Sequence, residues 1–182
     1  MSQFKLNLAM IAATMVMFVA ALAANELLFT RLEFAHGINW VYLPAGVRLL
    51  ATLLFAHAGA IGLLLVSTLV SFFWFFPDDP VRAAAGTIIS TVAPYGVYLA
   101  ARHVYGLKAS LSNLSPRSLL ECSLMYAIAG PLLHHLWFAF YEHKEDLLQS
   151  YLAMFTGDLA GTLIVLYGAR AVLMLLPRRP AV

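Results

Sequence analysis

The stretch from Leu43 to Phe76 constrains the fold most, because its 34 residues contain a single Asp, Glu, Lys or Arg side chain, that of Arg48. As one helix this stretch would be about 50 Å long, well beyond the ~30 Å thickness of a bilayer's hydrocarbon core. We therefore predict that it splits near His57-Ala58-Gly59 into two helices joined by a tight turn. The first of these helices, about 43–57, is short, and the second covers about 59–76.

The rest of the chain has the same character. Of its 182 residues, 62% are hydrophobic and 11% are charged, whereas an ordinary soluble domain has about 25% charged residues. A formal charge of +2, without a basic run interleaved with aromatic residues, argues against a nucleic acid partner. We predict an all-α, polytopic membrane helical bundle that contacts the lipid bilayer and forms a single integral membrane domain over 1–182.

Apolar runs and their boundaries predict six spans, at about 6–29, 43–57, 59–76, 81–105, 117–141 and 147–176. Positive residues favour the cytoplasmic side of a membrane. With both termini inside, seven Lys and Arg lie on the cytoplasmic side and four on the other: Lys5, Arg102, Lys108, Arg117, Arg170, Arg178 and Arg179 against Arg31, Arg48, Arg82 and Lys144. A five-span arrangement reverses this bias, so we expect six spans with cytoplasmic N- and C-termini.

The first apolar run also has features of a signal peptide. Lys5 precedes it, and Ala21-Leu22-Ala23 would fit a cleavage site with small residues. The run is long enough to cross the hydrocarbon core. We expect it to remain as a span, and its cleavage is an open alternative.

Two charged residues inside predicted spans define a candidate polar centre. Arg48 lies about one turn into its helix, and a charged side chain at a helix centre costs about 2.5–3.5 kcal/mol on insertion scales. Asp158 lies about eleven residues into the last span, near mid-membrane. We predict that both side chains point into the bundle, in direct or water-bridged contact. The alternatives are a purely structural ion pair, or an Asp158 held by hydrogen bonds to Thr162 and neighbouring helices.

His134 and His135 lie in the outer half of the fifth span. Adjacent residues on a helix point about 100° apart, so the two rings cannot easily bind one metal from the same face. A zinc site also needs three or four convergent ligands. We predict neither a metal site nor a cofactor, with one ring toward the bundle and the other against a neighbouring helix or the interface.

The sixth span contains Gly157-x-x-x-Gly161, a spacing that allows close helix approach, and Ala153 and Gly168 extend the same small-residue face. No nucleophile and base pair, phosphate loop or cysteine cluster stands out. We expect that the protein is not an enzyme.

Two motifs together resemble the MASE1 group of bacterial integral membrane sensory domains: Trp40-x-x-x-Pro44-x-Gly46 at the start of a helical hairpin, and Gly157-Asp158-x-x-Gly161 in the last span. The resemblance extends from about Leu27 to Leu176 and implies a signal- or ligand-receiving module of the bacterial inner membrane. Members of that group are typically fused to cytoplasmic histidine kinase or diguanylate cyclase domains. This chain shows no such domain and fewer helices, so we expect a separate protein partner.

Two other functions are open at this point. The chain could be the substrate-binding membrane component of a small-molecule transporter that works with an ATP-driven module, or a structural or assembly subunit without a ligand. Self-association into a homo-oligomer is also open. A kinase or cyclase encoded next to this chain would favour sensing, and a pair of ATPases would favour transport.

Overall fold

The computed structural model describes residues 2–107, 115–143 and 146–175, with side chains as far as Val172. Five long helices account for most of this part of the chain, which confirms an all-α membrane bundle. They are α1 (Gln3–Phe29), α2 (Leu43–Val70), α3 (Pro80–Tyr105), α4 (Pro116–Trp137) and α5 (Leu147–Leu175). Shorter elements lie between them: η1 (Thr30–Leu32), β1 (Glu33–Ala35), β2 (Ile38–Asn39), and the π-helical turns η2 (Ser71–Phe75) and η4 (Phe138–Glu142).

Local sequence sets several helix ends. The side chains of Ser2, Asp79 and Ser115 accept hydrogen bonds from backbone N–H groups in the first turns of α1, α3 and α4. Such N-caps satisfy donors that have no partner inside the helix. Pro80 and Pro116 then occupy first helical positions, where a missing N–H costs nothing. Gly106, with φ at +59°, ends α3 in the left-handed region.

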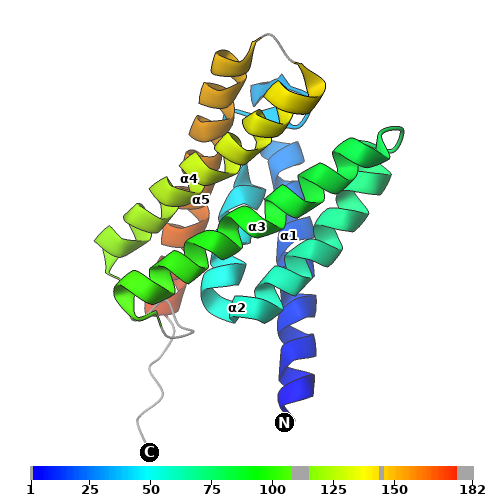
Figure 1. Cartoon of the computed structure of the whole chain (residues 1–182). Coiled ribbons are helices and arrows are strands. Elements are labelled where there is room, and N and C mark those ends of the chain that lie inside the picture. Colours follow the sequence, from blue (N-terminus) through cyan, green and yellow to red (C-terminus); the bar gives the residue numbers. More distant parts are fainter. Residues whose placement is uncertain (1, 108–114, 144–145, 176–182) are drawn as a thin grey trace, which may run out of the picture.

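The helix α2 reverses direction at Ala56, directly before the predicted turn at His57-Ala58-Gly59. Ala56 has φ +50° and ψ −122°, far from helical values. A Cβ on Gly59 would lie 2.2 Å from the carbonyl oxygen of Ala51, although residues eight apart in a continuous helix are separated by about 12 Å. The chain therefore folds back on itself, and Figure 1 shows two arms of α2 that leave the turn in different directions.

The number of spans differs from the predicted six. Among the described residues, four helices are long and apolar enough to cross a membrane: Gln3–Leu32, Leu43–Phe75, Pro80–Tyr105 and Leu147–Val172. The first arm of α2, Leu43–Phe55, is about 20 Å long and too short to cross ~30 Å by itself. The helix α4 is not among the four, and Arg117, Glu121 and its two histidines lower its hydropathy.

This first arm is the central element of the bundle. Every residue from Leu43 to Leu53 is buried, because α1, α3 and α5 pack around the two arms of α2. The β1–β2 hairpin lies at the top of the bundle in Figure 1, and we call this end the hairpin end. The start of α1 and the last turns of α5 lie toward the opposite end.

Reporter fusions test the predicted topology. A fusion after Pro180 should report the cytoplasm and a fusion at Glu145 the other side, because the two positions flank the last span; both positions lie outside the described residues. A fusion in the Asp78-Asp79 turn should match the Glu145 fusion, since the predicted topology puts both connections on the side opposite the cytoplasm. Fusions at Pro180 and Glu145 that report one side would show that the last helix does not cross the membrane.

Candidate functional site

The start of α2 lies inside the bundle, where neighbouring helices hold its backbone. The N–H of Leu43 donates to Oδ1 of Asn25 on α1 over 2.9 Å, and the N–H of Tyr42 donates to the carbonyl oxygen of Gly157 on α5 over 3.1 Å. Asn25 is 1% exposed. Backbone away from water must be satisfied by protein, so these two bonds allow a helix to begin within the bundle.

Three glycines make room for this arrangement. A Cβ on Gly157 would lie 1.9 Å from the carbonyl oxygen of Asn39, and a Cβ on Gly161 would lie 1.9 Å from that of Tyr42. A Cβ on Gly46 would lie 2.5 Å from Cβ of Val165. The two α5 glycines therefore allow the extended backbone that leads into α2 to pack directly on α5. Gly46 allows the first arm of α2 to approach α5 closely. Pro44, in the first turn of α2, is buried beside them.

Arg48 and Asp158 are both buried, at 8% and 2% exposure. The Arg48 guanidinium lies over the rings of Phe18 and Tyr42, 5.3 and 5.5 Å from their centroids. Arg48, Tyr42, Tyr126 and Asp158 form one electrostatic cluster. Within the described residues, no ion pair within 4.0 Å joins Arg48 to Asp158, so the expected direct contact is not formed and a water bridge stays a prediction.

The two residues have different surroundings. Oδ2 of Asp158 lies 3.2 Å from the position that a Cβ on Gly130 would take, so the carboxylate sits against α4. Nε of Arg48 is buried and has no hydrogen-bond partner among the described residues. Arg48 also lines a cavity that Asp158 does not line. Arg48 is therefore a buried cation with room next to it.

This cavity, of about 70 Å³, extends from the buried start of α2 to the exposed β1–β2 hairpin, and we call it the Arg48 cavity. The helices α2, α3, α4 and α5 contribute to its wall, together with both π-helical turns. Its lining residues are His36, Gly37, Ile38, Tyr42, Arg48, Ser71, Phe75, Phe76, Arg82, Gly86, Ile89, Ser90, His134, Trp137, Phe138 and Met154.

A second arginine lies in the wall of the Arg48 cavity. Nε of Arg82 is 3.2 Å from Oε1 of Glu142, and its guanidinium lies 4.4 Å from the centroid of the Phe76 ring. The indole of Trp137 stacks on Tyr141 with centroids 4.3 Å apart. Its Nε1 is buried and has no hydrogen-bond partner in the described part of the chain.

Comparison with known proteins adds a family to this geometry. The family model MASE1 matches residues 9–179, nearly the whole chain. The chain belongs to the MASE1 family. MASE1 domains are membrane-associated sensory domains, so this is a membrane sensory module. The match begins within α1, before the Leu27 boundary at which the motif resemblance starts. No curated protein and no solved structure matches the chain.

The MASE1 motif residues converge at one place in the fold. Pro44 and Gly46 begin the central arm of α2, and Gly157 and Gly161 hold that start against α5. Trp40 is different: it is 41% exposed, and its ring meets the Phe34 ring edge-on at 5.9 Å between centroids. Trp40 does not line the Arg48 cavity.

The two histidines of this MASE1 domain have separate environments. His134 lines the Arg48 cavity, and its Nδ1 is 2.9 Å from the carbonyl oxygen of Gly130. His135 is 2.8 Å from the Ser150 hydroxyl through Nε2 and packs against Tyr151 on α5. Within the described residues, no three His, Cys, Asp or Glu side chains are arranged to hold a metal ion.

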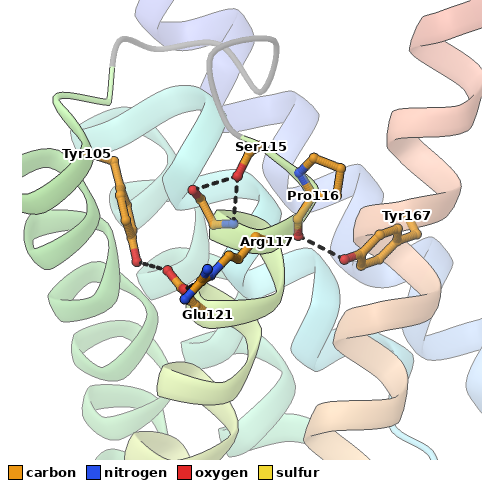
Figure 2. A network of polar contacts seen from close by, with 7 residues as sticks. Tyr105, Ser115, Pro116, Arg117, Glu121 and Tyr167 are labelled. Atoms are coloured by element: carbon orange, nitrogen blue, oxygen red, sulfur yellow. Dashed lines mark hydrogen bonds and ion pairs between the residues drawn. The ribbon is translucent and has the colours of Figure 1, made fainter.

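A second polar network lies at the end opposite the hairpin. Figure 2 shows Tyr105 at the end of α3 donating to the Glu121 carboxylate, which also accepts from Nε of Arg117 over 2.9 Å. The hydroxyl of Tyr167 on α5 donates to the carbonyl oxygen of Pro116 over 2.9 Å. These bonds link α3, α4 and α5. Glu121 therefore links the end of α3 to the first turns of α4.

Proposed function

We propose that this MASE1 domain is the receiving module of a bacterial inner-membrane sensory system. A small ligand, or a change in the envelope, acts on the Arg48 cavity, and the response passes by helix movement to a separate protein partner. The observation that carries this proposal is Arg48 itself, a buried cation without a direct ion pair in the described part of the chain that lines an open cavity. Charged groups at membrane depth mark functional sites by default.

A structural role alone would call for a closer partner. A buried ion pair offsets the desolvation of its charges only when contact and hydrogen bonding are good. Asp158 lies within electrostatic range of Arg48, but no ion pair joins the two side chains in the part of the chain that the structure describes. The arrangement thus keeps one charge accessible from the Arg48 cavity, which a binding site requires and a packing contact does not.

The first arm of α2 offers a route for the signal. Arg48 lies two turns before the reversal at Ala56, whose backbone occupies a region that costs about 1–3 kcal/mol for a residue other than glycine. The same arm contacts α3, where Oγ1 of Thr52 donates to the carbonyl oxygen of Pro94 over 3.2 Å. A shift of Arg48 toward a ligand would move this arm, and with it the turn at the opposite end. Sensing requires only two such conformations with different ligand affinities.

Filling the Arg48 cavity tests this function without removing a charge. Gly86 on α3 lines the cavity, and a Cβ there would meet only Oγ of Ser71, at 4.0 Å. Gly86→Leu should fold normally and occupy the space that a ligand needs. Gly96→Leu is the matched control, because Gly96 lies on the same helix with nothing within 4 Å of its Cβ position.

The readout is the gene-expression profile of the cells, measured in a growth condition in which deleting the protein changes that profile. The Gly86→Leu strain should depart from wild type at normal protein abundance, while the Gly96→Leu strain should match wild type. A Gly86→Leu profile that equals the wild-type profile would remove the Arg48 cavity from the sensory function.

A further inference from the structure

We infer that the Arg48 cavity binds a small oxyanion, with a carboxylate or phosphate group held by Arg48 and Trp137. This inference rests on the proposed function, since it names the class of ligand for the same cavity. It follows from the hydrogen-bonding character of the wall, the absence of an ion pair to Arg48 among the described residues and the available volume.

The unsatisfied groups in the wall are donors. Arg48 Nε and Trp137 Nε1 are both buried and have no hydrogen-bond partner in the described residues, and arginine and tryptophan side chains donate but do not accept. A buried donor without an acceptor costs free energy. The hydroxyls of Ser71 and Ser90 can add further donors. An acceptor-rich ligand would satisfy these groups together.

The charge of Arg48 favours an anion over water as the occupant of the cavity. Two acids near the cavity could compete with a bound anion for its arginines. Oε1 of Glu142 lies 3.2 Å from Nε of Arg82, and Asp158 lies against Gly130, outside the cavity wall. Neither contacts Arg48 within 4.0 Å. Water would satisfy the donors but supply no negative charge, whereas an oxyanion would supply both acceptors and a charge. Charge-assisted bonds of this kind are about twice as strong as neutral ones.

The volume limits the ligand's size. A cavity needs about 10–15 Å³ for one water measured in the same way, so 70 Å³ holds about five waters. Phosphate and acetate have about that many non-hydrogen atoms. A larger molecule could place only its anionic group beside Arg48, with the remainder at the exposed hairpin near His36. Such a group could come from a free solute or from a lipid headgroup.

The test is ligand-induced stabilisation of the purified full chain in nanodiscs of phosphatidylcholine. Inorganic phosphate and acetate are titrated at constant ionic strength in chloride, and acetamide serves as the neutral counterpart of acetate. Binding to the folded state raises the unfolding temperature with ligand concentration and yields Kd. A parallel series in nanodiscs that also contain phosphatidylglycerol tests the lipid source.

Two variants locate the site. Arg48→Gln should weaken oxyanion binding by about 10-fold to 100-fold, and Trp137→Phe, which keeps the ring but removes the N–H, by about 2-fold to 10-fold. Arg31→Gln and Trp74→Phe are the controls, since both residues are exposed and neither lines the Arg48 cavity. Trp137→Phe keeps the test decisive if Arg48→Gln fails to fold.

Stabilisation by phosphate or acetate, lost in the cavity variants and kept in the controls, supports a soluble oxyanion. Stabilisation by phosphatidylglycerol with the same dependence on the variants supports a lipid headgroup. The inference is overturned if neither oxyanion nor lipid stabilises the protein more than acetamide and chloride do, or if the control variants lose binding equally. In that case an altered profile of the Gly86→Leu strain would still support the proposed function with a ligand of another class.

Discussion

Gly161→Ala should destabilise the folded protein by about 3 kcal/mol, the upper end for overpacking a buried site. The added Cβ would lie 1.9 Å from the Tyr42 carbonyl oxygen and 2.3 Å from its carbon. Both are backbone atoms, so no side-chain rotation can relieve the overlap. The start of α2 would have to move away from α5, and the bond between the Tyr42 N–H and Gly157 would be strained or lost. Thermal unfolding in detergent or nanodiscs measures the change.

Gly168→Ala is the matched control on the same helix, because nothing lies within 4 Å of a Cβ at Gly168. It should leave stability unchanged or raise it by about 0.5–1 kcal/mol, since alanine favours a helix over glycine. Equal small effects of the two substitutions would show that Gly161 does not pack against the Tyr42 backbone in the folded protein.

Much of the fold could be predicted because a bilayer leaves few choices. Backbone groups in lipid must be satisfied within the chain, so long apolar runs form helices. The length of Leu43–Phe76 alone required a break, and the structure has a reversal at Ala56. The count of six spans could not be settled this way, because hydropathy does not show that the first arm of α2 is enclosed by protein.

The candidate site was partly visible in the sequence for the same physical reason. Arg48 and Asp158 stand out because charges inside apolar helices are costly. Arg82 and Trp137 do not, because basic and aromatic residues near helix ends are usual at a membrane interface. Their place in the wall of the Arg48 cavity depends on how η2, α3 and α4 pack. Asn25 interrupts an apolar run, and such a buried amide could have been recognised as a backbone partner.

The glycine motif shows a different limit. The Gly157-x-x-x-Gly161 spacing predicts a close approach, but it does not specify the partner. In the structure the partner is the extended segment Asn39–Leu43 that leads into α2, in place of the face of another long helix. Gly168, predicted to extend the same face, lies open, with nothing near its Cβ position.

Removing one charge of the polar centre should have the second large effect on stability. Arg48→Ala leaves Asp158 buried without its nearby cation, and Asp158→Ala leaves Arg48 in the same position. Breaking a buried charge pair by removing one partner costs about 3–5 kcal/mol. We expect about 3 kcal/mol for each variant, because the two groups are neighbours that are not in contact. The double variant should recover much of this loss.

A stability cycle of the two single variants and the double variant measures this coupling by thermal unfolding. Arg31→Ala is the control for the loss of one positive charge at an exposed position near the hairpin end. Additive losses, with the double variant least stable of all, would show that Arg48 and Asp158 do not interact across the bundle.

The response of the double variant tests the central claim most directly. If Arg48 and Asp158 form a site, cells with the double variant should contain folded protein at near wild-type stability and should show the expression profile of the deletion strain. The site needs the charges themselves, and neutrality alone does not replace them. A stable double variant with the wild-type expression profile would contradict the account and leave the pair a purely structural element.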